Sequence, residues 1–220
     1  RVHDFGWATC FRIRGWDAAR DTPYRLRHGD SAVFEGVVRK APKKREIVLA
    51  ALSCNSSKDR GLRPNYVRNL RHQDPDLLFF AGDQSYDHRQ HTAAWLKFGL
   101  QFRDVFRDRP CITIPDDHDV GHANLWGESG GVAKLPGGAD GGYLHHPEYV
   151  RMVERAQTAH LPDPVDPKPV GQGIGVYFTE LVLGGVSFAI LEDRKFKTGP
   201  AGTIPPVASP SRSSDPPPRS

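Results

Sequence analysis

The sequence predicts an α/β protein built on a parallel β-sheet, because apolar runs and amphipathic stretches alternate along its central part. The apolar runs lie at residues 46–54, 77–81 and 111–115. Between them, residues 62–73 and 91–106 repeat apolar side chains at helical spacing. Strands that alternate with helices in this way are joined by right-handed crossovers, which place the strands side by side and parallel.

The composition is that of a globular chain with one sizeable core. Of its 220 residues, 38% are hydrophobic and 25% are charged. No apolar run reaches the ~18 residues of a transmembrane helix. The net charge of +4 lies partly in short basic clusters at 39–46 and 107–110, which lack the interleaved aromatic side chains of a nucleic-acid groove. We therefore expect no membrane span and no nucleic-acid module, and the oligomeric state stays open.

Residues 1–44 are predicted to form the C-terminal part of an N-terminal β-sandwich domain. Stretches rich in aromatic and β-branched residues lie at 7–13, 22–28 and 31–40, with Gly and Asp turns between them. This region is too short for a complete sandwich. Ala41-Pro42 marks its boundary with the core that follows.

The core is predicted to cover residues 45–197, followed by a disordered Pro/Ser-rich tail at 198–220. The Gly-rich stretch 120–146 is long enough to be a loop that covers a site. After it, residues 147–160 read as a helix that begins with a proline. Residues 175–193 read as two strands joined through a Gly-Gly turn.

Each of the three parallel strands is followed at once by polar side chains. The segments are "SCNSS", "GDQSYD" and "PDDHD". Their potential metal ligands are Cys54, Asp83, Tyr86, Asp116, Asp117, His118 and Asp119. Because the carboxyl ends of parallel strands share one rim of the sheet, these side chains are expected to meet there. Carboxylates packed this closely repel each other, and a multivalent cation relieves the repulsion.

The mixture of ligand types narrows the metal and the reaction. A thiolate and a phenolate beside carboxylates suit a transition metal, and further oxygen donors suit a hard divalent ion. Two ions ~3.5–4 Å apart are arranged for displacement at phosphorus, with His118 placed to protonate the leaving oxygen or to stabilise the charge that develops there. Taken singly, Cys54 reads as a small buried hydrophobe, Asp117 as a helix cap and Tyr86 as a packing residue. Cys10 and Cys111, within apolar runs, are expected to be packed hydrophobes.

These segments also resemble a known family. "LSCN", "GDQSYDH", "DDHD" and "ILEDRKFK" are similar, in order and spacing, to segments of the PhoD-like alkaline phosphatase D metallophosphatases of the calcineurin-like phosphoesterase superfamily. The likeness extends from about residue 46 to 197. The β-rich start is consistent with it, because this family carries a sandwich domain before its catalytic domain.

The resemblance implies a partial metallophosphoesterase α/β/β/α sandwich with a bimetallic or trimetallic centre, often iron with calcium. It makes Cys54, Asp83 and Tyr86 iron ligands, with Asp83 as the candidate bridge between metals. It places Asp117 and, more weakly, Asn124 at the second metal, and it makes His118 the catalytic histidine. Arg194 would help to shape the substrate pocket. The implied activity is hydrolysis of phosphodiesters or phosphomonoesters by an exported enzyme, periplasmic or extracellular.

The sequence departs from this family pattern at its end. A late Gly-Asp-x-His segment that supplies further metal ligands in the family does not occur after residue 83. We therefore expect a C-terminally truncated chain with an incomplete second metal site and at most residual phosphatase activity. The alternative is a catalytically inactive remnant or binding module that retains part of the fold. Nucleic-acid binding through the basic loops is the weakest of the three hypotheses.

Overall fold

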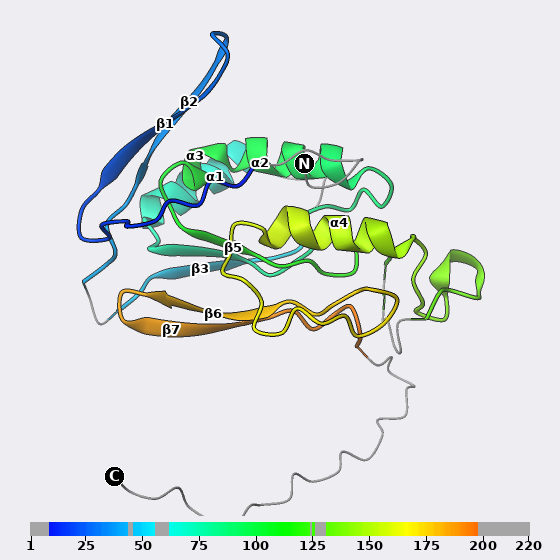
Figure 1. Ribbon diagram of the computed structural model, residues 1–220. Helices are drawn as coiled ribbons and strands as arrows, with labels where there is room; N and C mark the ends of the chain where they lie inside the picture. The colour runs from blue at the N-terminus through cyan, green and yellow to red at the C-terminus, as the bar shows by residue number, and fades with distance from the viewer. Residues whose placement is uncertain (1–8, 44–45, 56–61, 124, 126–130, 198–220) are drawn as a thin grey trace, which may run out of the picture.

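The computed structural model describes residues 9–43, 46–55, 62–123, 125 and 131–197 and places a layer of helices over two stacked β-sheets (Figure 1). In chain order the elements are β1 (Thr22–His28), β2 (Ala32–Val38), β3 (Leu49–Leu52), α1 (Arg63–Gln73), β4 (Leu77–Phe80), α2 (His91–Gln101), α3 (Arg103–Phe106), β5 (Cys111–Thr113), a short 3-10 helix (Pro136–Gly138), α4 (Pro147–Thr158), β6 (Phe178–Leu183) and β7 (Val186–Leu191). The described helices include none that combines the length and the apolar character of a membrane span.

The central sheet confirms the predicted α/β core. Its strands are parallel in the order β3-β4-β5. Leu49 is opposite Leu77, and Leu78 is opposite Cys111. The helix expected over 91–106 is divided into α2 and α3 at Phe102, where φ is −105° and ψ is 8°.

One face of this sheet packs against the helices through a cluster of aromatic rings. Side chains alternate between the two faces of a strand, so Leu78 and Phe80 of β4 point to the same side. The Phe80 ring lies 5.0 Å from Phe98, 5.0 Å from Phe102 and 5.5 Å from Phe106, between ring centroids. The bend at Phe102 therefore accompanies an arrangement in which all three helical rings surround one strand residue.

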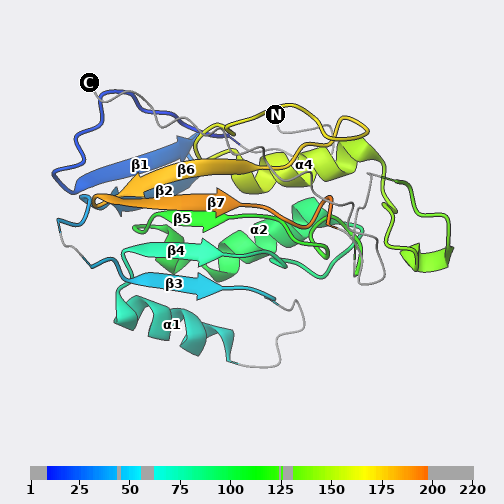
Figure 2. The same cartoon turned by 90° about the horizontal axis from the view of Figure 1, so that it is seen from below.

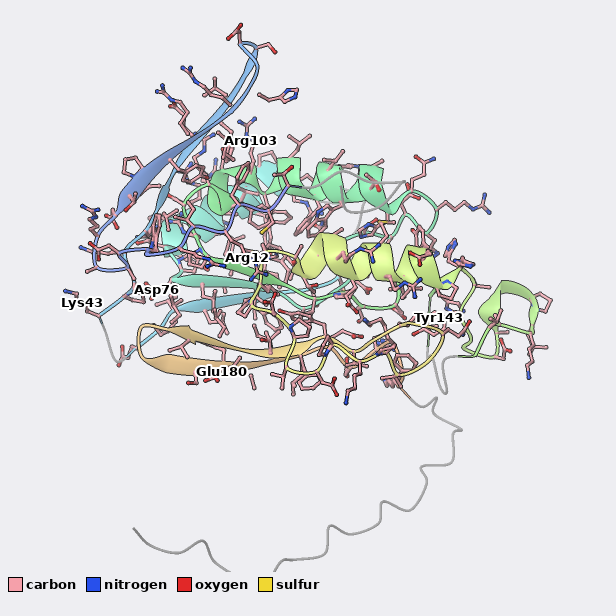
Figure 3. All side chains as sticks on the ribbon, in the orientation of Figure 1. Arg12, Lys43, Asp76, Arg103, Tyr143 and Glu180 are labelled. Atoms are coloured by element: carbon pink, nitrogen blue, oxygen red, sulfur yellow. The ribbon has the colours of Figure 1, made fainter. Side chains whose placement is uncertain are left out.

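The opposite face packs against a second sheet made by the antiparallel strands β6 and β7. These strands are joined at Gly184-Gly185, as the sequence predicts. Leu77 and Ile112 from the first sheet share a buried cluster with Ile190 of β7. Glu180 lies on the outer side of the second sheet, facing solvent (Figure 3).

The second sheet covers the β4–β5 side of the first sheet, and β3 lies beyond it (Figure 2). On β3, Leu49 is 43% exposed and Ala51 is also exposed. Helix, sheet and sheet thus form three consecutive layers of the predicted partial sandwich.

The strands β1 and β2 form a hairpin that projects away from the stacked layers (Figure 1). Its base is attached to the helical layer. The Tyr24 hydroxyl donates to the Arg107 carbonyl at 2.8 Å, and the Arg107 guanidinium lies 5.2 Å from the centroid of the Phe34 ring. Arg39 forms an ion pair with Asp74, the residue after α1.

The expected third strand at 7–13 is not formed by residues 9–13, the part of it that the structure describes. These residues contact the chain after α4 instead. Arg12 donates to the Asp163 carboxylate at 2.8 Å and to the Leu161 carbonyl at 3.4 Å. Polar contacts with this loop thus replace strand pairing. The assignment of residues 1–44 to a β-sandwich domain stays a prediction.

The cysteine assignments are partly corrected. All three cysteines are free, and Cys111 is partly buried beside the helical cluster, as predicted. Cys10 is exposed, and its thiol donates to the Ala159 carbonyl at 3.3 Å. The expectation of a packed Cys10 is therefore wrong, because its segment lies on the surface. The disordered tail predicted at 198–220 lies outside the described residues.

Candidate metal centre

The loops that follow β3 and β4 remain paired beyond the sheet and form the floor of the candidate site. The backbone N–H of Cys54 donates to the Gly82 carbonyl at 3.2 Å, and that of Asn55 donates to the Asp83 carbonyl at 2.8 Å. Cys54 and Asp83 both have φ of 55°, in the left-handed region. Two strand ends therefore turn in the same way and carry a thiol and a carboxylate to the same place.

Gly82 allows the loop after β5 to join them. Its φ is 95°, and a Cβ added there would lie 2.4 Å from the Cβ of Asp116. Such an approach excludes any side chain, so glycine is required by both its conformation and its contact. The loop containing Asp116, Asp117 and His118 is thereby brought against the loop containing Asp83.

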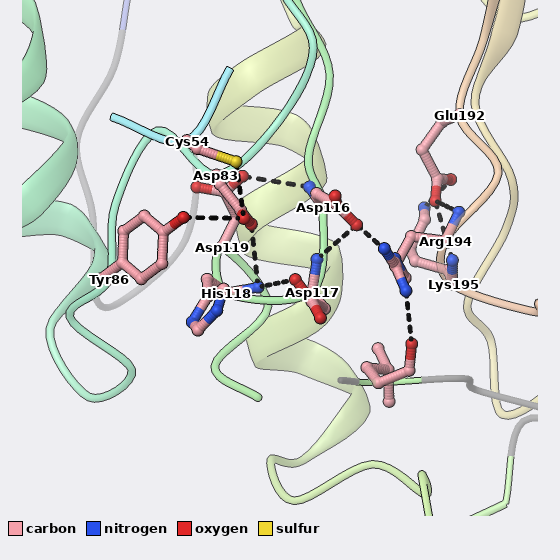
Figure 4. A network of polar contacts seen from close by, with 11 residues as sticks. Cys54, Asp83, Tyr86, Asp116, Asp117, His118, Asp119, Glu192, Arg194 and Lys195 are labelled. Atoms are coloured by element: carbon pink, nitrogen blue, oxygen red, sulfur yellow. Dashed lines mark hydrogen bonds and ion pairs between the residues drawn. The ribbon is translucent and has the colours of Figure 1, made fainter. Parts of the chain in front are cut away.

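The Asp83 carboxylate lies at the centre of the resulting group (Figure 4). One of its oxygens accepts the Tyr86 hydroxyl at 3.2 Å and lies 3.6 Å from the Cys54 sulfur. Its other oxygen accepts the backbone N–H of His118 at 3.3 Å. Asp83, Asp117 and His118 each present one potential ligand atom, and these atoms lie within 4.8 Å of one another.

The electrostatics of this group favour a bound cation. Burial raises the pKa of Asp83, and the nearby carboxylates of Asp116 and Asp117 raise it further. Burial likewise raises the pKa of Tyr86, beside Cys54 and Asp83. A multivalent ion reverses both effects, because it stabilises the deprotonated ligands that repel one another in its absence. The thiol, phenol, carboxyl and imidazole donors fit a transition metal.

Two carboxylates that the sequence offered as possible ligands have other partners. Asp119 is 1% exposed and accepts the backbone N–H groups of Ser85 at 3.2 Å and Asp116 at 3.0 Å. Burial raises its pKa to about 7. Asp116 accepts the Arg194 guanidinium and the backbone N–H of Asp117. Asp119 thus connects the loops after β4 and β5, and Asp116 connects the site to the chain after β7.

The structure brings together five of the seven site residues predicted from the sequence: Cys54, Asp83, Tyr86, Asp117 and His118. Arg194 is linked to this group through Asp116. It forms an ion pair with Asp116 and donates to the Leu125 carbonyl at 3.4 Å. Asn124 lies outside the described residues. The convergence of the strand ends is confirmed, whereas the metal-binding, catalytic and substrate-binding roles stay predictions.

The sequence analysis assigned no role to His88, which the structure places against His118. His88 Nε2 lies 2.6 Å from His118 Nδ1. The His118 ring also packs against the Tyr86 ring, at 4.1 Å between centroids. Burial lowers the pKa of His88, and so do neighbouring histidines, His118 first. The sequence signal was a histidine two residues after Tyr86.

Comparison with known proteins gives a likeness in fold alone. No protein-family model matches the sequence, and no curated protein matches it. A solved structure described as PhoD superposes with a TM-score of 0.52 and 19% sequence identity, over 81% of this chain and 38% of that chain. A purple acid phosphatase from yellow lupin (Lupinus luteus) seeds superposes with a TM-score of 0.50 and 16% identity, over 80% of this chain and 30% of that chain.

This chain spans less than two fifths of the length of either neighbour. The mixed α/β architecture superposes on both neighbours over about four fifths of this chain. The described part of this chain therefore has a partial metallophosphoesterase fold.

Proposed function

We propose that the centre around Asp83 binds metal and hydrolyses phosphate esters, either phosphodiesters or phosphomonoesters. The observation that carries this proposal is the convergence of Asp83, Asp117 and His118 beside Cys54 and Tyr86, at the carboxyl ends of parallel strands. Open α/β sheets bind their ligands at this edge. The fold likeness to two phosphatases supports the same reaction class.

The donor set divides into two parts. Cys54, Asp83 and Tyr86 would hold a transition metal, for which we propose iron. Asp117, together with Asn124, would contribute to a hard divalent ion, for which we propose calcium. Metal ions in such a centre polarise the phosphoryl group and supply an activated water. Asp83 lies between the two parts and is suited to contact both.

His118 is suited to the proton transfer that ends the reaction. As the bond from phosphorus to the leaving oxygen breaks, negative charge develops on that oxygen. A proton from the His118 ring neutralises it, which contributes on the order of 10²–10⁴ to the rate in typical cases. Tyr86 packs against one side of this ring, so the imidazole is held in place. Arg194 would act at the rim, where it orients Asp116 and a substrate oxygen.

A second candidate function is metal binding without turnover. It is favoured by the small number of clustered ligands, since the described residues supply one three-residue group, Asp83, Asp117 and His118. Two-metal hydrolysis needs further ligands for the second ion. Export to the periplasm or the exterior remains part of the proposal through the sequence resemblance.

One purified preparation of the chain tests both candidates. We expect bound metal and, because the sequence predicts an incomplete second metal site, only residual metal-dependent hydrolysis of bis-p-nitrophenyl phosphate or p-nitrophenyl phosphate. Asp117→Asn should lower turnover at least ~10²-fold, as loss of an essential ligand exceeds the ~10–100-fold effect of an outer partner. Asp30→Asn, in the exposed turn of the β1–β2 hairpin, is the matched control and should retain activity.

Alkylation of Cys54 reports metal binding independently of turnover. A coordinated thiolate should react slowly until a chelator removes the metal, whereas exposed Cys10 should react equally in both conditions. Protection of Cys54 without hydrolysis would favour the binding module. Equal labelling of Cys54 with and without chelator, together with no hydrolysis, would contradict both candidates.

A further inference from the structure

We propose that His88 is the positioning residue for His118. Its Nε2 accepts a hydrogen bond from the His118 Nδ1–H, which leaves the Nε2 of His118 to carry the transferred proton. This inference rests on the proposed function of the centre. It concerns a side chain that is not itself among the predicted ligands and that contacts Nδ1 of the His118 ring.

The contact between the two rings is a hydrogen bond whose direction matters. His88 Nε2 and His118 Nδ1 are 2.6 Å apart, and the ring planes differ by 30°. A neutral imidazole has one nitrogen that donates and one that accepts. One of the two nitrogens in this contact must therefore carry the proton, and the partner must accept it.

The number of protons on the His118 ring decides the direction of this hydrogen bond. If His118 Nδ1 carries a proton to His88, the protonated His118 ring can release its Nε2 proton to the leaving oxygen and become neutral. If His88 donated instead, His118 would already be neutral with its proton on Nε2. Releasing that proton would create an imidazolate, a far stronger base than the leaving oxygen requires. Only acceptance by His88 Nε2 is compatible with acid catalysis by His118.

The local chain fixes His88 in this orientation. The Asp87 carboxylate accepts the backbone N–H groups of Arg89 and Gln90, each at 3.2 Å, and the Ser85 hydroxyl accepts the backbone N–H of Asp87 at 3.0 Å. These bonds hold a compact turn between Tyr86 and the start of α2. His88 lies within this turn, between the residues that these bonds hold.

A neutral acceptor also suits the charge of the site. In other enzymes a carboxylate orients the catalytic imidazole. Here the carboxylates of Asp83, Asp116 and Asp117 already lie close together. Burial, and repulsion from the other two carboxylates, raise the pKa of Asp83. An imidazole nitrogen orients His118 without adding a further negative charge that would repel a phosphate ester.

The tautomer of His118 can be measured without any substrate. Long-range ¹H–¹⁵N correlation spectra of the full chain should show His118 protonated at Nδ1 in the wild type. His88→Gln keeps an oxygen acceptor, so this tautomer should persist. His88→Phe keeps a planar ring but has no acceptor, so the Nε2–H tautomer should become populated. His72→Phe, at the exposed end of α1, is the matched control and should leave the His118 signals unchanged.

Turnover of bis-p-nitrophenyl phosphate or p-nitrophenyl phosphate provides the second readout. His88→Phe should lower kcat about 10–100-fold with little change in KM, and His88→Gln should recover most of it. A wild-type His118 protonated at Nε2, or the same tautomer in His88→Phe as in the wild type, would overturn the inference. If the wild type hydrolyses neither ester, the proposed function fails, whereas the spectra still decide the role of His88. If His88→Phe does not fold, the wild-type and His88→Gln spectra decide it.

Discussion

At the scale of single residues, the site depends on backbone conformations that most side chains avoid. Cys54 and Asp83 adopt positive φ in left-handed turns, and Gly82 adopts a φ of 95°. A non-glycine residue in the left-handed region costs about 1–2 kcal/mol. Part of the folding free energy is therefore used to direct a thiol and a carboxylate to the same point.

The first prediction separates the conformation of Gly82 from its contact. Gly82→Ala should lower the free energy of unfolding by about 1–2 kcal/mol from positive φ and by a further ~1–3 kcal/mol from the clash with Asp116. Gly185→Ala is the matched control, because Gly185 has φ of 80° and no atom within 4 Å of an added Cβ. Urea unfolding of both variants measures the difference. Equal losses would show that Asp116 moves aside easily.

The sequence predicts the chemistry of these residues better than their partners. Cys54, Asp83 and Asp117 could be placed together because each directly follows an apolar strand. Asp119 follows the same strand as Asp117, yet it turns inward and bonds the Ser85 backbone. His88 contacts a residue 30 positions away. Such orientations depend on tertiary packing, which the linear pattern does not contain.

At the scale of elements, a buried histidine at the start of α2 contacts helix α4. His91 is 1% exposed, and its Nε2 lies 3.3 Å from the Gln157 side-chain nitrogen in α4. The amide N–H of Gln157 donates to a neutral imidazole in this arrangement. Burial lowers the pKa of His91 to about 4.

The second prediction is a loss of stability in acid that originates at His91. Its folded pKa lies below the ordinary value of ~6.5, so the unfolded chain binds the proton first as the pH falls. Stability is complete above pH ~6.5 and should decline by about 3 kcal/mol as the pH falls to about 4. His91→Gln should remove this part of the acid loss in urea unfolding across that pH range.

Exposed His72 supplies the control for this measurement. His72→Gln should keep the wild-type loss of stability in acid, because the side chain at position 72 is exposed. A His91→Gln variant with the same acid loss as the wild type would show that the buried imidazole is not its source.

The same elements show where periodicity predicts structure and where it does not. Phe98, Phe102 and Phe106 recur every four residues, so the sequence predicts one continuous helix. The structure has a bend at Phe102, and the three rings surround Phe80. Spacing along the chain identifies the buried face, but it does not report the shape of the strand residue that this face must enclose.

At the scale of the whole molecule, two sheets share one apolar layer. Ile112 of β5 and Ile190 of β7 are both 3% exposed in it. The pairing of β6 with β7 was predictable from the Gly-Gly turn. The absence of pairing between residues 9–13 and β1 was not predictable. The β propensity of a residue shows that its side chain fits a sheet, but it does not identify the neighbouring strand.

The third prediction tests the packing between the sheets. Ile190→Ala should lower the free energy of unfolding by about 2–5 kcal/mol, since it leaves a cavity between two sheets. Val182→Ala, on β6 and 59% exposed, should change it by no more than ~0.5 kcal/mol. Denaturant unfolding of both variants gives the comparison. Similar losses in both would mean that the second sheet is not packed on the first.

Because the loops after β3 and β4 continue the pairing of the strands, the length of the segment between Leu49 and Cys54 is constrained. The Ala81 N–H bonds to the Leu52 carbonyl at 2.7 Å, and the contacts of Cys54 and Asn55 extend the same ladder. One codon inserted between Leu49 and Cys54 would advance the chain by about 3.3 Å and reverse the face of each side chain from the insertion to Cys54. A single substitution leaves this register in place, whereas an insertion or deletion of one residue would remove the thiol from the site at once.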